Sequence, residues 1–117
     1  MAATKWFGEV LLNGVRMKPV IGITVGDAAG VGPELAMQCA ALPEVAARCQ
    51  PVLYGPVDVL TEIGVAVGRD VPQRIVDIGE LKVDSIKPGE FSSESGIASY
   101  QAVEAAIEDA LAKRIDG

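Results

Sequence analysis

The sequence predicts an α/β fold, and three observations support this prediction. Pro19 to Val25 is a short apolar run typical of a buried parallel strand. It leads through glycines at 26, 30 and 32 to Pro33, whose fixed φ suits the start of a helix. Half of the 117 residues are apolar but only 4% are aromatic. The core must therefore be aliphatic, as it is in α/β proteins.

Further strands and helices are expected to alternate after this first unit. The first helix is predicted over Pro33–Leu42, with Leu35, Cys39 and Leu42 on its apolar stripe and Ala36 and Ala40 alongside. Pro43 stops that helix, although a further turn can form before the next strand. The predicted elements that follow are a turn at Glu44–Arg48, a strand at Gln50–Tyr54, a short helix at Asp58–Ile63 and a strand at Arg74–Ile78.

A long helix is predicted from Ser93 to Lys113. Its large apolar residues recur at steps of three and four, which predicts that they form its buried face: Ile97, Tyr100, Val103, Ile107 and Leu111. Ser92 or Ser93 can cap the helix. Its carboxylates are interpreted as a solvated face, with Asp109 and Lys113 as a favourable i,i+4 pair.

Charge and composition exclude several classes of function. The net charge is −6 and no segment gathers Lys and Arg, which argues against nucleic acid and acidic membrane surfaces as partners. The apolar runs are far too short to span a bilayer. Cys39 and Cys49 lack a metal-binding spacing, so we interpret them as buried free thiols of a cytoplasmic protein. Histidine is absent, which bars a histidine metal site or general base within these residues.

Residues 1–16 are interpreted as an amino-terminal extension, because Met17-Lys18-Pro19 would make a natural start immediately before the first strand. The extension lacks the basic start, long apolar centre and cleavage site of a signal peptide. A cloning remnant, an upstream start codon or an extra strand could each explain it, and we favour the first two. The remaining segment, 17–117, is expected to be part of one α/β domain.

The candidate binding residues are Gly26, Asp27, Gly30 and Gly32, in the loop between the first strand and the first helix. Such a loop places backbone N–H groups at the carboxyl end of a strand, where open α/β sheets bind ligands and helix N-termini attract anions. The loop is neither a P-loop, because Pro33 and Glu34 stand where Lys and Ser/Thr are required, nor a dinucleotide fingerprint. A plain connection without a ligand is the alternative. For Asp27, a turn or capping role is favoured over direct contact with a ligand hydroxyl.

Two segments resemble the amino-terminal part of the 4-hydroxythreonine-4-phosphate dehydrogenase (PdxA) family. Gly26-Asp27-Ala28-Ala29-Gly30-Val31-Gly32-Pro33-Glu34 is similar to the family's Gly-Asp-Pro-Ala-Gly-Ile-Gly-Pro-Glu, departing at Ala28 and conservatively at Val31. Gly89 to Gly96 is similar to its Gly-x-Leu-Ser-x-x-x-Gly, with Phe91 in place of leucine. The resemblance covers residues 17–117 and implies an amino-terminal fragment of a three-layer α/β/α fold like that of isocitrate and isopropylmalate dehydrogenases.

The resemblance also implies an activity for the complete enzyme. Members oxidise 4-phosphohydroxy-L-threonine with NAD and decarboxylate the product to 3-amino-2-oxopropyl phosphate, a precursor of pyridoxal phosphate. They work as homodimers with a divalent metal (Zn, Mg or Co) held by histidines, so this fragment is expected to bind no metal, to hold no catalytic residue and to be inactive alone.

Three alternatives to that activity stay open. A sister enzyme could oxidise 4-phospho-erythronate or 4-phospho-threonate, because the residues that contact the substrate are expected to lie elsewhere. The chain could also be a non-catalytic module that binds a nucleotide or a phosphorylated metabolite. A truncated product without function is the third alternative.

Overall fold

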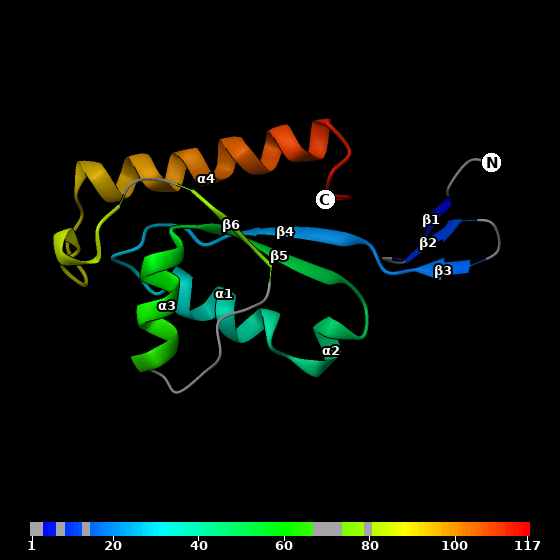
Figure 1. The fold of residues 1–117 in the computed structure, drawn as a ribbon, viewed down its shortest axis with the longest axis horizontal. Coiled ribbons are helices and arrows are strands. Elements are labelled where there is room, and N and C mark those ends of the chain that lie inside the picture. The colour runs from blue at the N-terminus through cyan, green and yellow to red at the C-terminus, as the bar shows by residue number, and fades with distance from the viewer. Residues whose placement is uncertain (1–3, 7–8, 13–14, 67–73, 79–80) are drawn as a thin grey trace.

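A computed structural model describes residues 4–6, 9–12, 15–66, 74–78 and 81–117. Its centre is a parallel sheet with the strand order β4-β5-β6 (Figure 1). The three strands are β4 (Val20–Thr24), β5 (Gln50–Gly55) and β6 (Ile75–Asp77). Gly22 lies opposite Val52, and Leu53 lies opposite Ile75. The strands predicted from apolar runs are therefore confirmed to within one or two residues at each end.

Helices cover both faces of this sheet, which confirms the predicted three-layer α/β/α fold. On one side lie α1 (Gly32–Ala40), α2 (Pro43–Ala46) and α3 (Val57–Ala66), and on the other lies α4 (Ser93–Leu111) (Figure 1). A single 3-10 turn, η1 (Val83–Ser85), lies between β6 and α4. The long helix ends two residues earlier than predicted, because Lys113 adopts a left-handed backbone with φ +61°.

The prediction of which residues of α1 are buried is wrong for its apolar stripe. Leu35, Cys39 and Leu42 are exposed, whereas Ala36 and Met37 are buried against Val25, Leu53 and Leu60. The apolar residues of this short helix fall on more than one face, so their spacing does not decide which face meets the sheet. Both cysteines are free, but Cys39 is exposed and Cys49 only half-buried, which corrects the expectation that they are buried.

The prediction of which face of α4 is buried is also wrong. All five large apolar residues assigned to it are exposed, and the buried residues of the helix are Ser95, Ala98 and Ala102 instead. Small side chains allow the helix to lie close to the sheet, where Ala102 contacts Val52 and Tyr54. The contact face is therefore made of the smallest residues of the helix.

Asp109 lies on this inner side as well, rather than on a solvated face. Its carboxylate accepts a hydrogen bond of 2.7 Å from the hydroxyl of Tyr54, which is fully buried, and pairs with Arg114 at 2.6 Å rather than with Lys113 as predicted. Burial, followed by the neighbouring Asp109 carboxylate, raises the pKa of Tyr54 to about 12. The hydrogen bond from Tyr54, followed by that from Arg114, lowers the pKa of Asp109.

The extension is built differently from the rest of the chain. Within residues 4–17, three short strands form an antiparallel sheet in the order β1-β2-β3, comprising β1 (Thr4–Trp6), β2 (Glu9–Leu12) and β3 (Val15–Met17). Among the described residues, no helix is long and apolar enough to cross a membrane.

Candidate functional site

The glycine loop, residues 26–32, follows β4 at the carboxyl end of the parallel sheet. Gly26 has φ +75°, a left-handed conformation that glycine adopts without steric cost. Next to it, Asp27 closes the turn. Its Oδ1 accepts a hydrogen bond of 2.8 Å from the amide of Ala29, and its backbone carbonyl accepts one of 3.0 Å from the amide of Gly30. The favoured turn role for Asp27 therefore agrees with the geometry.

Gly32 lies where the start of α1 approaches the end of β4 closely. A Cβ at this position would overlap the backbone carbonyl of Val25, so the start of α1 packs directly against the end of β4. At Gly30 a Cβ would lie 3.4 Å from the carbonyl oxygen of Asp27, which is an ordinary contact. The two glycines therefore differ in role, since Gly32 is required by packing and Gly30 is not.

The start of α4 holds the glycine loop from a second direction. Ser95 is 1% exposed and donates a hydrogen bond of 3.0 Å from its hydroxyl to Asp27 Oδ2. The amide of Gly89 donates one of 2.8 Å to the carbonyl of Ala29. Thus the two segments that carry the family resemblance, more than fifty residues apart in sequence, lie in contact.

Sequence reasoning missed Ser95 and Gly89 as neighbours of the loop, although both belong to the second resembling segment. Gly89, with φ +78°, follows Pro88 in a turn closed by the amide of Glu90, which donates to the carbonyl of Lys87. Ser92 caps α4, as predicted, by accepting a hydrogen bond of 3.1 Å from the amide of Ser95. The signal that could have predicted these contacts is that Gly89 and Ser95 both belong to the second segment of the family resemblance.

The outer side of the glycine loop is open. Gly30 and Val31 are exposed, and Val31 leads directly into the first turn of α1. A ligand can therefore reach this end of the helix, whereas both carboxylate oxygens of Asp27 accept hydrogen bonds from the protein. The arrangement suits contact through backbone amides, with Asp27 setting the shape of the loop.

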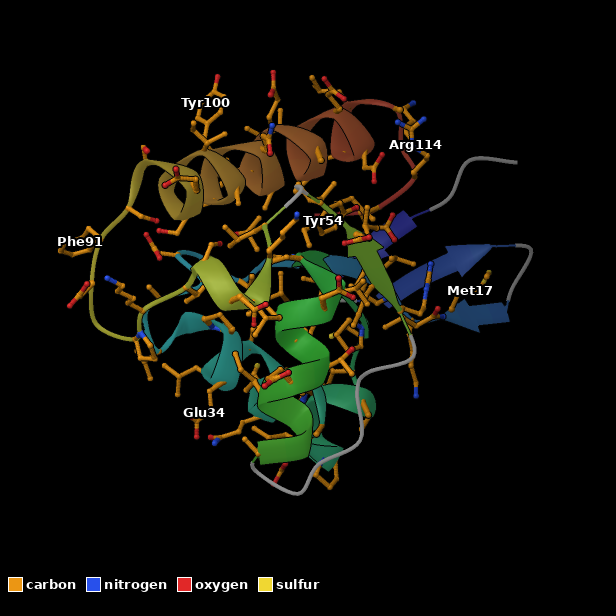
Figure 2. All side chains as sticks on the ribbon, turned by 60° about the vertical axis from the view of Figure 1, so that its left-hand side comes forward. Met17, Glu34, Tyr54, Phe91, Tyr100 and Arg114 are labelled. Carbon is orange, nitrogen blue, oxygen red and sulfur yellow. The ribbon has the colours of Figure 1, made fainter. Side chains whose placement is uncertain are left out.

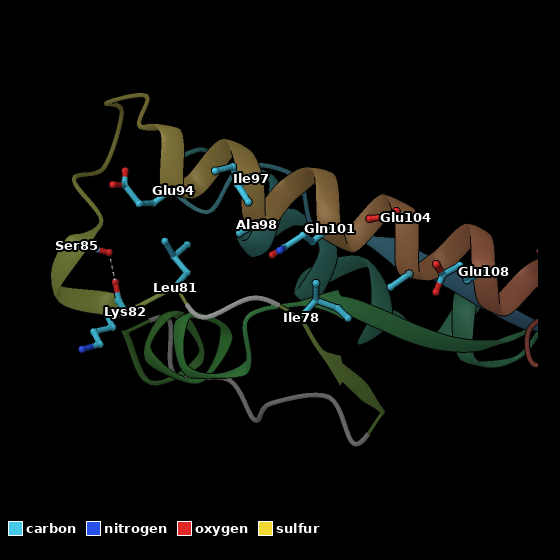
Figure 3. Close-up of a pocket in the computed structure, with 11 residues that line it drawn as sticks. Ile78, Leu81, Lys82, Ser85, Glu94, Ile97, Ala98, Gln101, Glu104 and Glu108 are labelled. Carbon is cyan, nitrogen blue, oxygen red and sulfur yellow. Dashed lines mark hydrogen bonds between the residues drawn. The ribbon is translucent and has the colours of Figure 1, made fainter.

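A separate groove of about 800 Å³ runs between α4 on one side and Ile78 with residues 81–85 on the other (Figure 3). Its floor is apolar and includes Ile78, Leu81 and Ala98, while Glu94, Glu104 and Glu108 supply negative charge along the helix. Lys82 is the basic residue among those that line it. This charge disfavours a phosphorylated ligand, so the groove is a poorer candidate than the loop.

In the part of the chain that the structure describes, no group of three or more His, Cys, Asp or Glu side chains could hold a metal ion. The residues described here therefore do not fit the divalent metal that the resemblance implies for the complete enzyme.

Comparison with known proteins supports the resemblance. No family model matches the chain. The D-threonate 4-phosphate dehydrogenase of Cupriavidus necator is 31% identical in an alignment of 113 positions that covers 84% of this chain and 34% of that protein. A 4-hydroxythreonine-4-phosphate dehydrogenase structure from Burkholderia phymatum matches with a TM-score of 0.75 and 32% identity, covering 83% of this chain and 34% of that one.

A second similar structure is named for another substrate. The terephthalate 1,2-cis-dihydrodiol dehydrogenase of Burkholderia xenovorans LB400 matches with a TM-score of 0.65 and 28% identity, covering 83% of this chain and 31% of that one. All three relatives are named as dehydrogenases, and this chain matches about the same share of each.

More specifically, more than four fifths of the chain is similar to proteins named 4-hydroxythreonine-4-phosphate dehydrogenase and D-threonate 4-phosphate dehydrogenase. The chain spans about one third of the length of the curated relatives that it matches.

Proposed function

We propose that this chain supplies the nucleotide-binding loop of an NAD-dependent dehydrogenase that acts on a 4-phosphorylated hydroxy acid. The observation that carries the proposal is the glycine loop, which is held by β4, α1 and α4 and open on its outer side. Backbone amides at Gly26 and Gly32 would meet the phosphate or ribose groups of NAD at the start of α1, with Gly30 held between them by its hydrogen bond to the carbonyl of Asp27. Asp27 would orient the loop through Ala29 and Ser95.

When bound, NAD would supply the hydride acceptor for oxidation of the substrate's secondary alcohol to a ketone, with release of a proton. When bound in the complete enzyme, a divalent metal would polarise the alcohol and carbonyl oxygens. The residues described here offer no ligands for it, so we place that site outside them. A homodimer in the cytoplasm belongs to the same proposal and rests on the resemblance.

Two substrates are candidates. 4-Phosphohydroxy-L-threonine follows from the resemblance and would yield 3-amino-2-oxopropyl phosphate after loss of CO₂, within pyridoxal phosphate biosynthesis. D-threonate 4-phosphate is favoured by the name of the Cupriavidus necator relative. Both present a secondary alcohol and a phosphate, so the loop does not discriminate between them.

A chimaera tests the proposal. Residues 17–117 would replace the matched third of the Cupriavidus necator enzyme, and NADH formation would be followed at 340 nm with each substrate and a divalent metal. We expect activity from the chimaera and none from the 117-residue chain alone.

Gly30→Ala should raise the KM for NAD because it adds a methyl group to the open side of the loop, while Gly96→Ala, which meets open space on α4, should not. An unchanged KM for NAD in the Gly30→Ala chimaera would contradict the proposed role of the loop.

A further inference from the structure

Helix α4 has two apolar faces of different character. The inner face, which meets the sheet, is made of small residues such as Ala98 and Ala102. The opposite side, here called the outer face, carries the large apolar residues with exposed fractions from 43% at Val103 to 79% at Leu111. It consists of Tyr100, Val103, Ile107 and Leu111, with Ile97 at its border where it also lines the groove. Figure 2 shows Tyr100 pointing away from the sheet.

This distribution is the reverse of an ordinary surface helix, which turns its large apolar residues inward. A helix that is apolar on two opposite faces is typically buried between two bodies. Five large apolar side chains along one helix also form a contiguous patch of the kind that marks an interaction site. The sheet covers only one side of α4, so the outer face requires another partner.

Charge argues against a second copy of this chain as that partner. Glu104 and Glu108 run along one flank of the outer face and are exposed. If two α4 helices paired antiparallel about a two-fold axis, these glutamate flanks would lie on the same side and repel each other. Each chain also carries a net charge of −6.

The additional polypeptide of the relatives is a better candidate for the partner that covers the outer face. They contain about twice as much further polypeptide as the third that this chain matches. In addition, the last two residues run beside the free edge of β4, where the amide of Asp116 donates to the carbonyl of Val20 and the carbonyl of Gly117 accepts from the amide of Gly22. The last two residues therefore lie along the edge of β4 that faces away from β5.

We propose that the outer face of α4 docks an apolar surface of the polypeptide that forms the remaining two thirds of the relatives. The outer face then becomes an internal interface of the complete dehydrogenase, and α4 becomes a central helix rather than a surface one. The proposal concerns packing, so its test measures stability and does not depend on NAD or substrate.

The test compares two substitutions to glutamate, each made in the 117-residue chain and in the chimaera. Ile107→Glu places a charge in the middle of the outer face, and Gln101→Glu places the same charge elsewhere on the same helix. In the 117-residue chain both variants should leave Tm within about 2 °C of the parent, because both side chains are exposed. In the chimaera with the Cupriavidus necator enzyme, Ile107→Glu should lower Tm by roughly 10 °C or more and Gln101→Glu should not. Equal Tm values for the two chimaera variants would overturn the proposal.

A second measurement decides the matter if the chimaera does not fold. The 117-residue chain would be co-expressed with the unmatched two thirds of the Cupriavidus necator protein and recovered by an affinity tag. We expect co-purification with the parent chain and with Gln101→Glu, and at least a tenfold loss with Ile107→Glu. No co-purification with the parent would overturn the proposal. A dimer of the chain alone, detected by light scattering and dissociated by Ile107→Glu, would also overturn it by assigning the outer face to a second copy.

Discussion

Gly32 offers the sharpest test of how the loop is built. A Cβ at this position would overlap the carbonyl oxygen of Val25. The backbone fixes the position of a Cβ, and its partner is a backbone oxygen, so no rotamer change can relieve the contact. Gly32→Ala must shift either the end of β4 or the start of α1. Overpacking of this kind costs roughly 1–3 kcal/mol. We therefore expect the free energy of unfolding to fall by about that amount.

Urea unfolding followed by circular dichroism measures this loss directly. The matched control is Gly96→Ala, because a Cβ there meets nothing within 4 Å and alanine is favoured over glycine in a helix by about 0.5–1 kcal/mol. The control should be as stable as the parent or more stable. If Gly32→Ala unfolds at the same urea concentration as the parent, the close approach of α1 to β4 is not a requirement of this fold.

Three further predictions follow from individual contacts. Tyr54→Phe removes the hydrogen bond to Asp109 and should lower the free energy of unfolding at neutral pH. Since the folded-state pKa of Tyr54 is raised to about 12, its contribution is fully present below about pH 10 and is lost as the pH rises towards 12. A pH series of urea titrations should show this loss in the parent and a weaker one in Tyr54→Phe, and identical profiles would refute the assignment. Ser95→Ala removes the hydroxyl that donates to Asp27 and should lower Tm by roughly 4–8 °C in a thermal melt, whereas a role confined to capping α4 by Ser92 would leave Tm unchanged. Deleting residues 1–16 should change Tm little, and a large decrease would show that the extension packs on the domain.

Local patterns in the sequence predicted most of the elements. The apolar run before Gly26 became β4, the glycines and Pro33 marked the start of α1, and Ser92 became the cap of α4. Each of these features depends on residues near one another in sequence, because strand burial, backbone conformation and capping are local properties.

Contacts between distant segments were not predictable in the same way. Periodicity identified α4 as a helix but could not tell which of its two apolar faces meets the sheet, and the large residue Ile107 was assigned inward where Ala102 lies. The bond from Tyr54 to Asp109 joins residues 55 positions apart, and that from Ser95 to Asp27 joins residues 68 apart. These pairings depend on how the layers assemble, which no single segment encodes.

The central claim is that the glycine loop binds the nucleotide. An NMR titration of the ¹⁵N-labelled 117-residue chain with NAD, up to millimolar concentration, tests it most directly. We expect saturable shifts of the amide signals of Gly26, Gly30 and Gly32, with little change at Gly96 on α4. Shifts confined to residues of the groove, such as Leu81 and Gln101, or no saturable shift in the loop, would contradict the claim.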